Sequence, residues 1–132
     1  MKKIALITGA TSGIGRATAI ALADEGYNLI LTGRRKERLD ELKELVAITY
    51  KADALVLNFD VRNSEEVTKA VASIPATWRK IDVLVNNAGI TKDGLMMRMD
   101  EAQWDTVIDT NLKSAFNFIH ACTPLMARQR CG

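Results

Sequence analysis

The chain has 132 residues, of which 48% are hydrophobic and 26% are charged, and this composition predicts one globular domain spanning residues 1–132. The net charge is only +2 and no basic stripe with interleaved aromatic residues occurs, so nucleic acid is not an expected partner. No apolar run reaches the roughly 18 residues that cross a bilayer, so we expect no membrane span. Two cysteines suggest neither a disulfide framework nor a metal site, and the expected location is the reducing cytoplasm.

The first part of the chain alternates short apolar runs with helical patterns. Strands are predicted at 3–7, 28–32 and 54–59, because each is a short and nearly continuous apolar run. Residues at helical spacing that predict the first helix are Ile14, Ala17, Thr18, Ala21 and Leu22, with Gly26 as its stop signal. Those that predict the second helix are Leu39, Leu42, Leu45 and Val46.

The second part continues the alternation. Asn63 is expected to cap a third helix, with Glu66 at the capping-box position and Pro75 closing the helix. A fourth strand is predicted at 81–85. Asp100 and Gln103 predict the start of a last helix, in which Met99 and Trp104 hold the positions of a hydrophobic staple. This helix should run to about Arg128, with a kink or an early end at Pro124.

Strands that alternate with helices at this spacing indicate right-handed βαβ units around a parallel sheet. Because the strands are apolar throughout, both sheet faces should be covered by helices. The prediction is therefore an α/β sandwich of three layers. A complete doubly wound dinucleotide-binding fold usually has six strands, so the four found here predict a truncated sheet in the order 3-2-1-4.

The turn after the first strand reads TGATSGIG at 8–15. Gly9 allows a tight exit from the strand, Gly13 lets the backbone approach a pyrophosphate, and Gly15 allows the helix to pack closely on the strand. Free N–H groups at the helix start would then face the phosphates. The alternative is a structural turn that happens to be rich in glycine.

Three more motifs follow in order: DV at 60–61, NNAG at 86–89, and Asn111 within DTNLKSAF. With these motifs the chain resembles the short-chain dehydrogenase/reductase family over nearly its whole length, which implies a Rossmann-like fold. The resemblance makes Thr11, Ser12, Gly13 and Ile14 the pyrophosphate cradle. It places Asp60 at the adenine amino group, Val61 beside the ring, and Asn87, Ala88 and Gly89 along the adenine ribose. Asn111 would distort the long helix and help to hold a water relay in the active site.

The end of the second strand decides between the two nicotinamide dinucleotides. An NAD-binding domain usually has an acidic residue there for the ribose 2′-hydroxyl, whereas this strand runs into Gly33, Arg34 and Arg35. Two guanidinium groups suit a 2′-phosphate. We therefore expect NADP(H) rather than NAD(H), with weak binding, unless both arginines are merely solvated residues at a helix start.

The catalytic residues of the resembled family are a Ser and a Tyr-x-x-x-Lys, in which the tyrosine acts as general acid and base. Neither Tyr27 nor Tyr50 is followed by Lys four residues later, and Ser114 and His120 are expected to be ordinary helix residues. Asn111 is then the family's only active-site residue present. The chain is expected to bind a dinucleotide without catalysing hydride transfer.

The sequence stops where the family would begin a fifth strand. The fourth strand would then be an exposed edge, and the last helix is apolar on more than one face, so we expect a homo-oligomer through 104–126, that edge, or both. Two alternatives stay open. The chain is part of an oxidoreductase completed by a C-terminal half, or it is an engineered chimera for folding studies. In the chimera, 1–89 would resemble the serine/3-hydroxy-acid dehydrogenase branch and 90–130 the 3-ketoacyl-carrier-protein reductase branch.

Overall fold

A computed structural model describes residues 2–11, 13–89 and 96–132. Its centre is a sheet of four parallel strands in the order β3-β2-β1-β4, which confirms the predicted topology. The strands are β1 (Ile4–Ile7), β2 (Asn28–Gly33), β3 (Ala54–Asn58) and β4 (Val83–Val85). Ala5 is the partner of Leu29 on one side and of Val83 on the other, so β1 lies inside the sheet.

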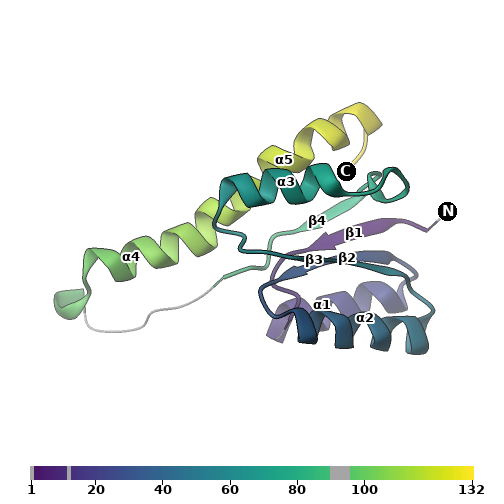
Figure 1. Cartoon of the computed structure of the whole chain (residues 1–132), viewed down its shortest axis with the longest axis horizontal. Helices are drawn as coiled ribbons and strands as arrows, with labels where there is room; N and C mark the ends of the chain where they lie inside the picture. Colours follow the sequence, from purple (N-terminus) through teal and green to yellow (C-terminus); the bar gives the residue numbers. More distant parts are fainter. Residues whose placement is uncertain (1, 12, 90–95) are drawn as a thin grey trace.

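Helices cover both faces of the sheet, as the apolar strands predicted (Figure 1). Helices α1 (Gly13–Asp24) and α2 (Lys36–Tyr50) lie on one face, and α3 (Ser64–Ser73) and α5 (Ser114–Gln129) lie on the other. Successive strand side chains point to opposite faces. Thus β1 sends two buried side chains to each layer. The three-layer α/β sandwich is confirmed.

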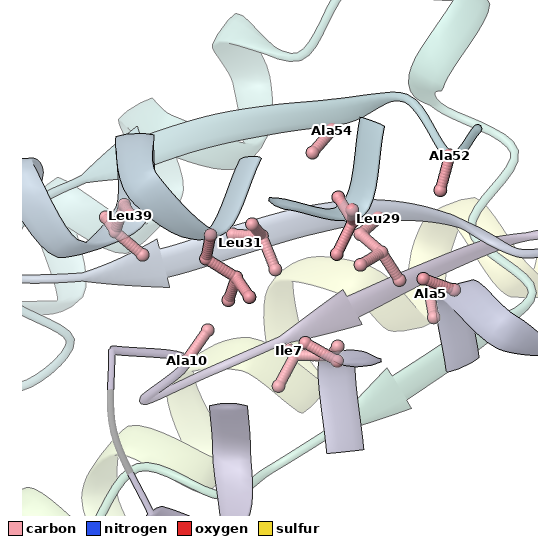
Figure 2. Packing of buried hydrophobic residues seen from close by; sticks show 12 residues of the cluster. Ala5, Ile7, Ala10, Leu29, Leu31, Leu39, Ala52 and Ala54 are labelled. Atoms are coloured by element: carbon pink, nitrogen blue, oxygen red, sulfur yellow. The ribbon is translucent and has the colours of Figure 1, made fainter. Parts of the chain in front are cut away.

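The layer under α1 and α2 includes the residues that adjoin the glycine-rich turn. Figure 2 shows Ile7 of β1 and Leu29 and Leu31 of β2 in the same layer as Leu39 of α2, and all four side chains are fully buried. Ala10, at the start of the turn, closes this layer at the end of β1. Its backbone N–H donates to the Thr32 carbonyl at 3.1 Å. The core therefore fixes where the turn leaves the sheet.

The apolar residues that predicted α1 mark its buried face only in part, since Leu22 packs against the core. Ile14 is 78% exposed and Ala17 and Ala21 are also exposed, whereas the buried residues are Gly15, Ala19 and Ala23. Spacing of larger apolar residues misled the prediction, because this helix approaches the sheet through its smallest side chains. A helix can approach a sheet closely only where its side chains are small. Small side chains are weakly apolar, so hydropathy alone does not identify the buried face of α1.

Helix α3 begins where predicted, but only one half of the predicted capping box forms. The Asn63 side chain accepts from the N–H groups of Glu65 and Glu66 at 3.0 and 3.1 Å. The Glu66 carboxylate accepts from the backbone N–H of Asp60 at 3.3 Å instead of returning to Asn63. The helix ends at Ser73, before Pro75, and the short 3-10 turn η1 (Ala76–Trp78) follows. Glu66 thus ties the helix start to the loop after β3.

The last helical segment is not one regular helix. After the 3-10 turn η2 (Met96–Arg98), α4 (Glu101–Ile108) begins with the predicted capping box of Asp100 and Gln103. A π-helical turn, η3 (Asp109–Lys113), then leads into α5. Pro124 does not end α5, which continues to Gln129. Figure 1 shows α4 extending away from the sheet. The irregularity falls at the position that the resemblance assigned to Asn111.

Strand β4 is shorter than predicted, because Ile81 is buried outside the strand and the Asp82 carboxylate accepts from the Ile4 N–H at 2.9 Å. No helix within the described residues is long and apolar enough to cross a membrane. In the same part of the chain, no three His, Cys, Asp or Glu side chains form a group that could hold a metal ion.

Candidate functional site

A cleft of about 750 Å³ lies at the carboxyl ends of the four strands. This is the edge at which ligands bind to open parallel sheets, beside the point where the strand order reverses between β1 and β4. Of the predicted site residues, Ser12 lies outside the described residues and Gly15 lies behind the cleft. The remainder line it: Gly9, Thr11, Gly13, Ile14, Arg34, Arg35, Asp60, Val61, Asn87, Ala88, Gly89 and Asn111.

The three glycines of the turn perform different tasks. Gly9 has φ +66°, and a Cβ there would lie 2.9 Å from the Cα of Ala88. Gly13 has φ +59° and no atom within 4 Å of where a Cβ would point, so its backbone is bare toward the cleft. A Cβ on Gly15 would collide with the Gly9 carbonyl oxygen and the Asn87 amide. The close approach predicted for Gly15 is therefore to the turn itself rather than to the strand.

Thr8 joins the turn to the segment after β4. Its side-chain oxygen accepts from the backbone N–H groups of Asn87 at 3.0 Å and Ala88 at 2.9 Å. Asn87 also donates its side-chain amide to the Gly9 carbonyl at 3.2 Å. These hydrogen bonds therefore join the TGATSGIG turn to the NNAG segment at the cleft. Sequence reasoning missed Thr8 because the hydroxyl acts on residues that are distant in the chain.

Arginines crowd one side of the site. Arg34 lines the main cleft, and Arg35 lines both it and an adjoining cleft of about 640 Å³. Thr11 and Gly13 also line both clefts, and the second cleft adds Arg16 and Arg38, which the sequence analysis did not select. The second cleft also contains the carboxylates of Glu37 and Glu41. Arg35 is therefore the one basic residue among the described residues that line both clefts, and it lies there with Thr11 and Gly13 of the glycine-rich turn.

Asp60 and Arg62 form an ion pair in the cleft, with 2.7 Å between Arg62 Nη2 and Asp60 Oδ2. The hydrogen bonds from Arg62 hold the pKa of the Asp60 carboxyl below its ordinary value of 3.8, against an opposing effect of burial. The same pairing raises the pKa of Arg62. Asp60 is therefore a fixed negative charge at the end of β3, and Arg62 is a site residue that the sequence did not reveal.

Val61 anchors this loop against the sheet. It is buried with α3 and α5 side chains, and its carbonyl accepts from the Asn117 side-chain amide at 3.5 Å. Phe59 lines the cleft and its ring centroid lies 5.9 Å from that of Phe118 in α5. An apolar wall therefore lies next to the Asp60 carboxylate, which suits a flat ring with a polar edge.

The π-helical turn brings two residues, Thr110 and Asn111, to the lining of the cleft. A Cβ on Gly89 would lie 3.1 Å from Asn111 Oδ1, so the glycine makes room for this side chain. Ser114 donates its hydroxyl to the Thr110 carbonyl, which loses regular helical partners in such a turn. The distortion expected at Asn111 is present as this turn.

The tyrosines and the histidine lie outside this cleft. Tyr27 precedes β2 and Tyr50 is the last residue of α2, and both pack against the core beneath α1 and α2. His120 is exposed on α5 and stacks on Phe116 with 5.6 Å between ring centroids. None of the three is positioned to act in the cleft.

The comparisons with known proteins agree with this geometry. The family model described as short chain dehydrogenase matches residues 3–132. The chain belongs to the short-chain dehydrogenase family. The family model covers both the glycine-rich turn and the π-helical turn with Asn111, so the two walls of the cleft lie within the matched region.

Three relatives illustrate the similarity. The 3-oxoacyl-[acyl-carrier-protein] reductase FabG of Staphylococcus aureus is 45% identical over all of this chain and 54% of its own length. Serine dehydrogenase from Escherichia coli is 37% identical with a TM-score of 0.89, over 98% of this chain and 58% of that one. L-Sorbose reductase from Gluconobacter frateurii, solved with NADPH and L-sorbose, is 30% identical with a TM-score of 0.91, over 97% and 49%. The chain thus spans about half the length of these relatives.

Proposed function

We propose that residues 1–132 form the NADP(H)-binding part of a short-chain dehydrogenase. The observation that carries the proposal is the cleft, where the bare backbone of Gly13 faces a basic margin made by Arg34 and Arg35. Backbone N–H groups at the start of α1 and the helix dipole would bind the pyrophosphate. The guanidinium groups would bind the 2′-phosphate, since the end of β2 has no carboxylate for a 2′-hydroxyl.

The other predicted contacts fit the same ligand. Asp60 would accept from the adenine amino group beside Val61, and Asn87, Ala88 and Gly89 would lie along the adenine ribose. Asn111 stands at the far wall of the cleft, where it would take part in a water relay. A bound nicotinamide would supply hydride-transfer chemistry. The solved relative that contains NADPH shares this fold and supports the assignment.

The proposed activity of these residues alone is binding rather than turnover. Hydride transfer would need a Ser and a Tyr-x-x-x-Lys in addition, and neither Tyr27 nor Tyr50 is followed by the required Lys. The second candidate is therefore a part of an NADP-dependent oxidoreductase, which the coverage of about half of each relative favours. Turnover that appears only when a C-terminal half is added would support it. The chimera remains a prediction, which a genome encoding the uninterrupted chain would contradict.

Titration of the purified chain with NADPH and NADH, followed by nucleotide fluorescence, tests the proposal. We expect NADPH to bind at least about tenfold more tightly, because charge-assisted hydrogen bonds to a phosphate are each worth about 1.5–3 kcal/mol. Replacing Arg34 and Arg35 together by Ala should remove the preference. Arg128→Ala is the matched control, because Arg128 is exposed at the other end of the sheet. An unchanged preference in the double variant would refute the NADP assignment.

We also propose that the chain self-associates through α4, η3 and α5. Apolar side chains of these elements are exposed although polar ones are buried: Leu112 and Phe116 are 66% and 63% exposed, while Thr110, Ser114 and Asn117 are buried beside Phe118 and Cys122. Trp104 and Ile119 extend the exposed apolar surface. Apolar residues gathered on an outer face are typical of protein interfaces. A second copy of the same surface would cover them, and the outer edge of β4 is a further candidate.

Sedimentation at tens of micromolar protein tests this association. The wild type should sediment as a dimer or larger species, and Leu112→Ser combined with Phe116→Ser should shift it to a monomer. Ile48→Ser is the control, because Ile48 is an apolar residue on α2 that is 82% exposed, more than either tested residue. A wild type that is strictly monomeric, or a control that dissociates equally, would contradict the proposal.

A further inference from the structure

The contacts between Asp60 and Arg62 leave little of the Asp60 carboxylate for a ligand. Oδ1 accepts from the Arg62 backbone N–H at 3.0 Å and from Arg62 Nε at 3.1 Å. Oδ2 accepts from Arg62 Nη2 at 2.7 Å, with Nε also within 3.2 Å. The Arg62 and Asp60 side chains are 39% and 31% exposed, and both line the main cleft. The carboxylate is therefore oriented before any ligand arrives.

A carboxylate has two oxygens with about four acceptor positions in total. Two well-placed donors fill Oδ1, whereas Oδ2 has one close donor and shares Nε with Oδ1. One acceptor position therefore remains, and it is on Oδ2. A ligand N–H can use this position, but a ligand carbonyl oxygen placed there meets a negatively charged oxygen that has no proton to donate. The geometry favours a donor at this point of the cleft.

We infer that Arg62 is a positioning residue that aims the Asp60 carboxylate and thereby makes the cleft select a purine with an amino group over one with a carbonyl group in its place. The inference rests on the proposed function, in which the adenine base lies beside Val61. Arg62 acts through Asp60, so its effect depends on the carboxylate being present.

The loop does not need Arg62 to keep its path. The Asp60 N–H donates to the Glu66 carboxylate at 3.3 Å, and the Asp60 carbonyl accepts from the Asn63 N–H at 3.2 Å. Val61 is buried in the core. A partly exposed ion pair contributes little to stability. Removing the guanidinium leaves only the backbone N–H of residue 62 on Oδ1, so the carboxylate should be able to turn about that one contact while the backbone stays in place, which separates selectivity from folding.

The experiment compares the binding of NADPH with that of its analogue in which hypoxanthine replaces adenine, so that a carbonyl replaces the amino group. The wild type should prefer NADPH by about tenfold, and Arg62→Ala should reduce the preference to about twofold by weakening NADPH alone. Arg62→Lys keeps the charge but loses the two-point contact, and should resemble Arg62→Ala. The thermal midpoint of both variants should stay near that of the wild type, and Arg128→Ala controls for loss of charge.

The same substitution in an Asp60→Asn background decides how Arg62 acts. If Arg62 works through the carboxylate, Arg62→Ala should change the preference no further in that background. Equal weakening of both nucleotides by Arg62→Ala, or an undiminished preference for NADPH, would overturn the inference while leaving the proposed function standing. A wild type that binds neither nucleotide would instead overturn the proposed function, and this inference with it.

Discussion

Replacing Thr8 by Val should destabilise the protein and weaken nucleotide binding together. The hydroxyl is almost completely buried and accepts from two backbone N–H groups, those of Asn87 and Ala88, at 3.0 and 2.9 Å. Valine has nearly the same shape, so the substitution opens no cavity. The Val85 carbonyl keeps its backbone partners, since it also accepts from the N–H groups of Thr8 and Asn87 at 3.1 Å. The lost interactions are therefore confined to two donors.

The magnitude follows mainly from the Ala88 N–H, because the Asn87 N–H keeps the Val85 carbonyl as an acceptor. A buried N–H without an acceptor costs about 1–3 kcal/mol. Asn87 and Ala88 are half-buried, so water can satisfy part of what is lost. We expect Thr8→Val to lower the free energy of unfolding by about 2 kcal/mol in total. Urea titration followed by circular dichroism measures this difference, and an unchanged slope with denaturant shows that the same surface unfolds.

Thr8→Ser is the matched control for this prediction. It keeps the hydroxyl and removes only one methyl group, which should cost about 1 kcal/mol. NADPH affinity should fall in Thr8→Val and stay near wild type in Thr8→Ser, because the hydroxyl holds the NNAG segment against the glycine-rich turn. The reasoning fails if Val is within about 0.5 kcal/mol of the wild type, or if Ser destabilises the protein as much as Val does.

Three other substitutions or treatments test the rest of the structure. Gly15→Ala should lower the free energy of unfolding by at least about 2 kcal/mol, because the new methyl group meets the Gly9 carbonyl; a thermal melt within error of wild type would contradict this. Asp60→Asn should be less stable than the wild type at neutral pH. Since the pKa of the folded carboxyl lies below 3.8, that difference should be constant above about pH 5 and vanish as the pH falls through the lowered pKa; a difference that grows in acid would refute the pairing. Burial raises the pKa of the Cys122 thiol to about 11 while Cys131 is exposed, so a thiol reagent at pH 8 should modify one cysteine quickly, and Cys131→Ser should remove that reaction. Two fast thiols in the folded protein would show that Cys122 is accessible.

The sheet could be predicted from sequence because its signals are local. Each strand is an apolar run bounded by turn residues, and the alternation with helices fixes a parallel order. The face of α1 could not be predicted in this way. Its contact is made by Gly15, Ala19 and Ala23, whose role depends on how closely the turn and the helix approach one another.

In the site, too, residues with local sequence signals could be predicted, and residues that act through tertiary contacts could not. Motifs whose residues lie next to one another in the chain, such as the glycine-rich turn, led to the correct cleft. Residues that act across the fold did not stand out: Thr8 binds a segment some 80 residues away. Arg62 has no motif, and only the rotamer of its side chain shows that it pairs with Asp60 rather than with solvent. Arg16 and Arg38 belong to different helices and meet at one cleft only after folding.

The π-helical turn also bears on how this family can vary in length. Such a turn is an α-helix that has gained one residue, so losing one residue between Asp109 and Lys113 would let α4 and α5 join as a regular rod. Each residue of an α-helix advances by about 100°, so deleting Leu112, which lies between Asn111 and α5, would rotate Asn111 away from the cleft while the sheet-covering part of α5 kept its place. A continuous helix formed from α4 and α5 would gain backbone hydrogen bonds, but Asn111 would no longer line the cleft. This deletion should consequently raise the free energy of unfolding and weaken nucleotide binding.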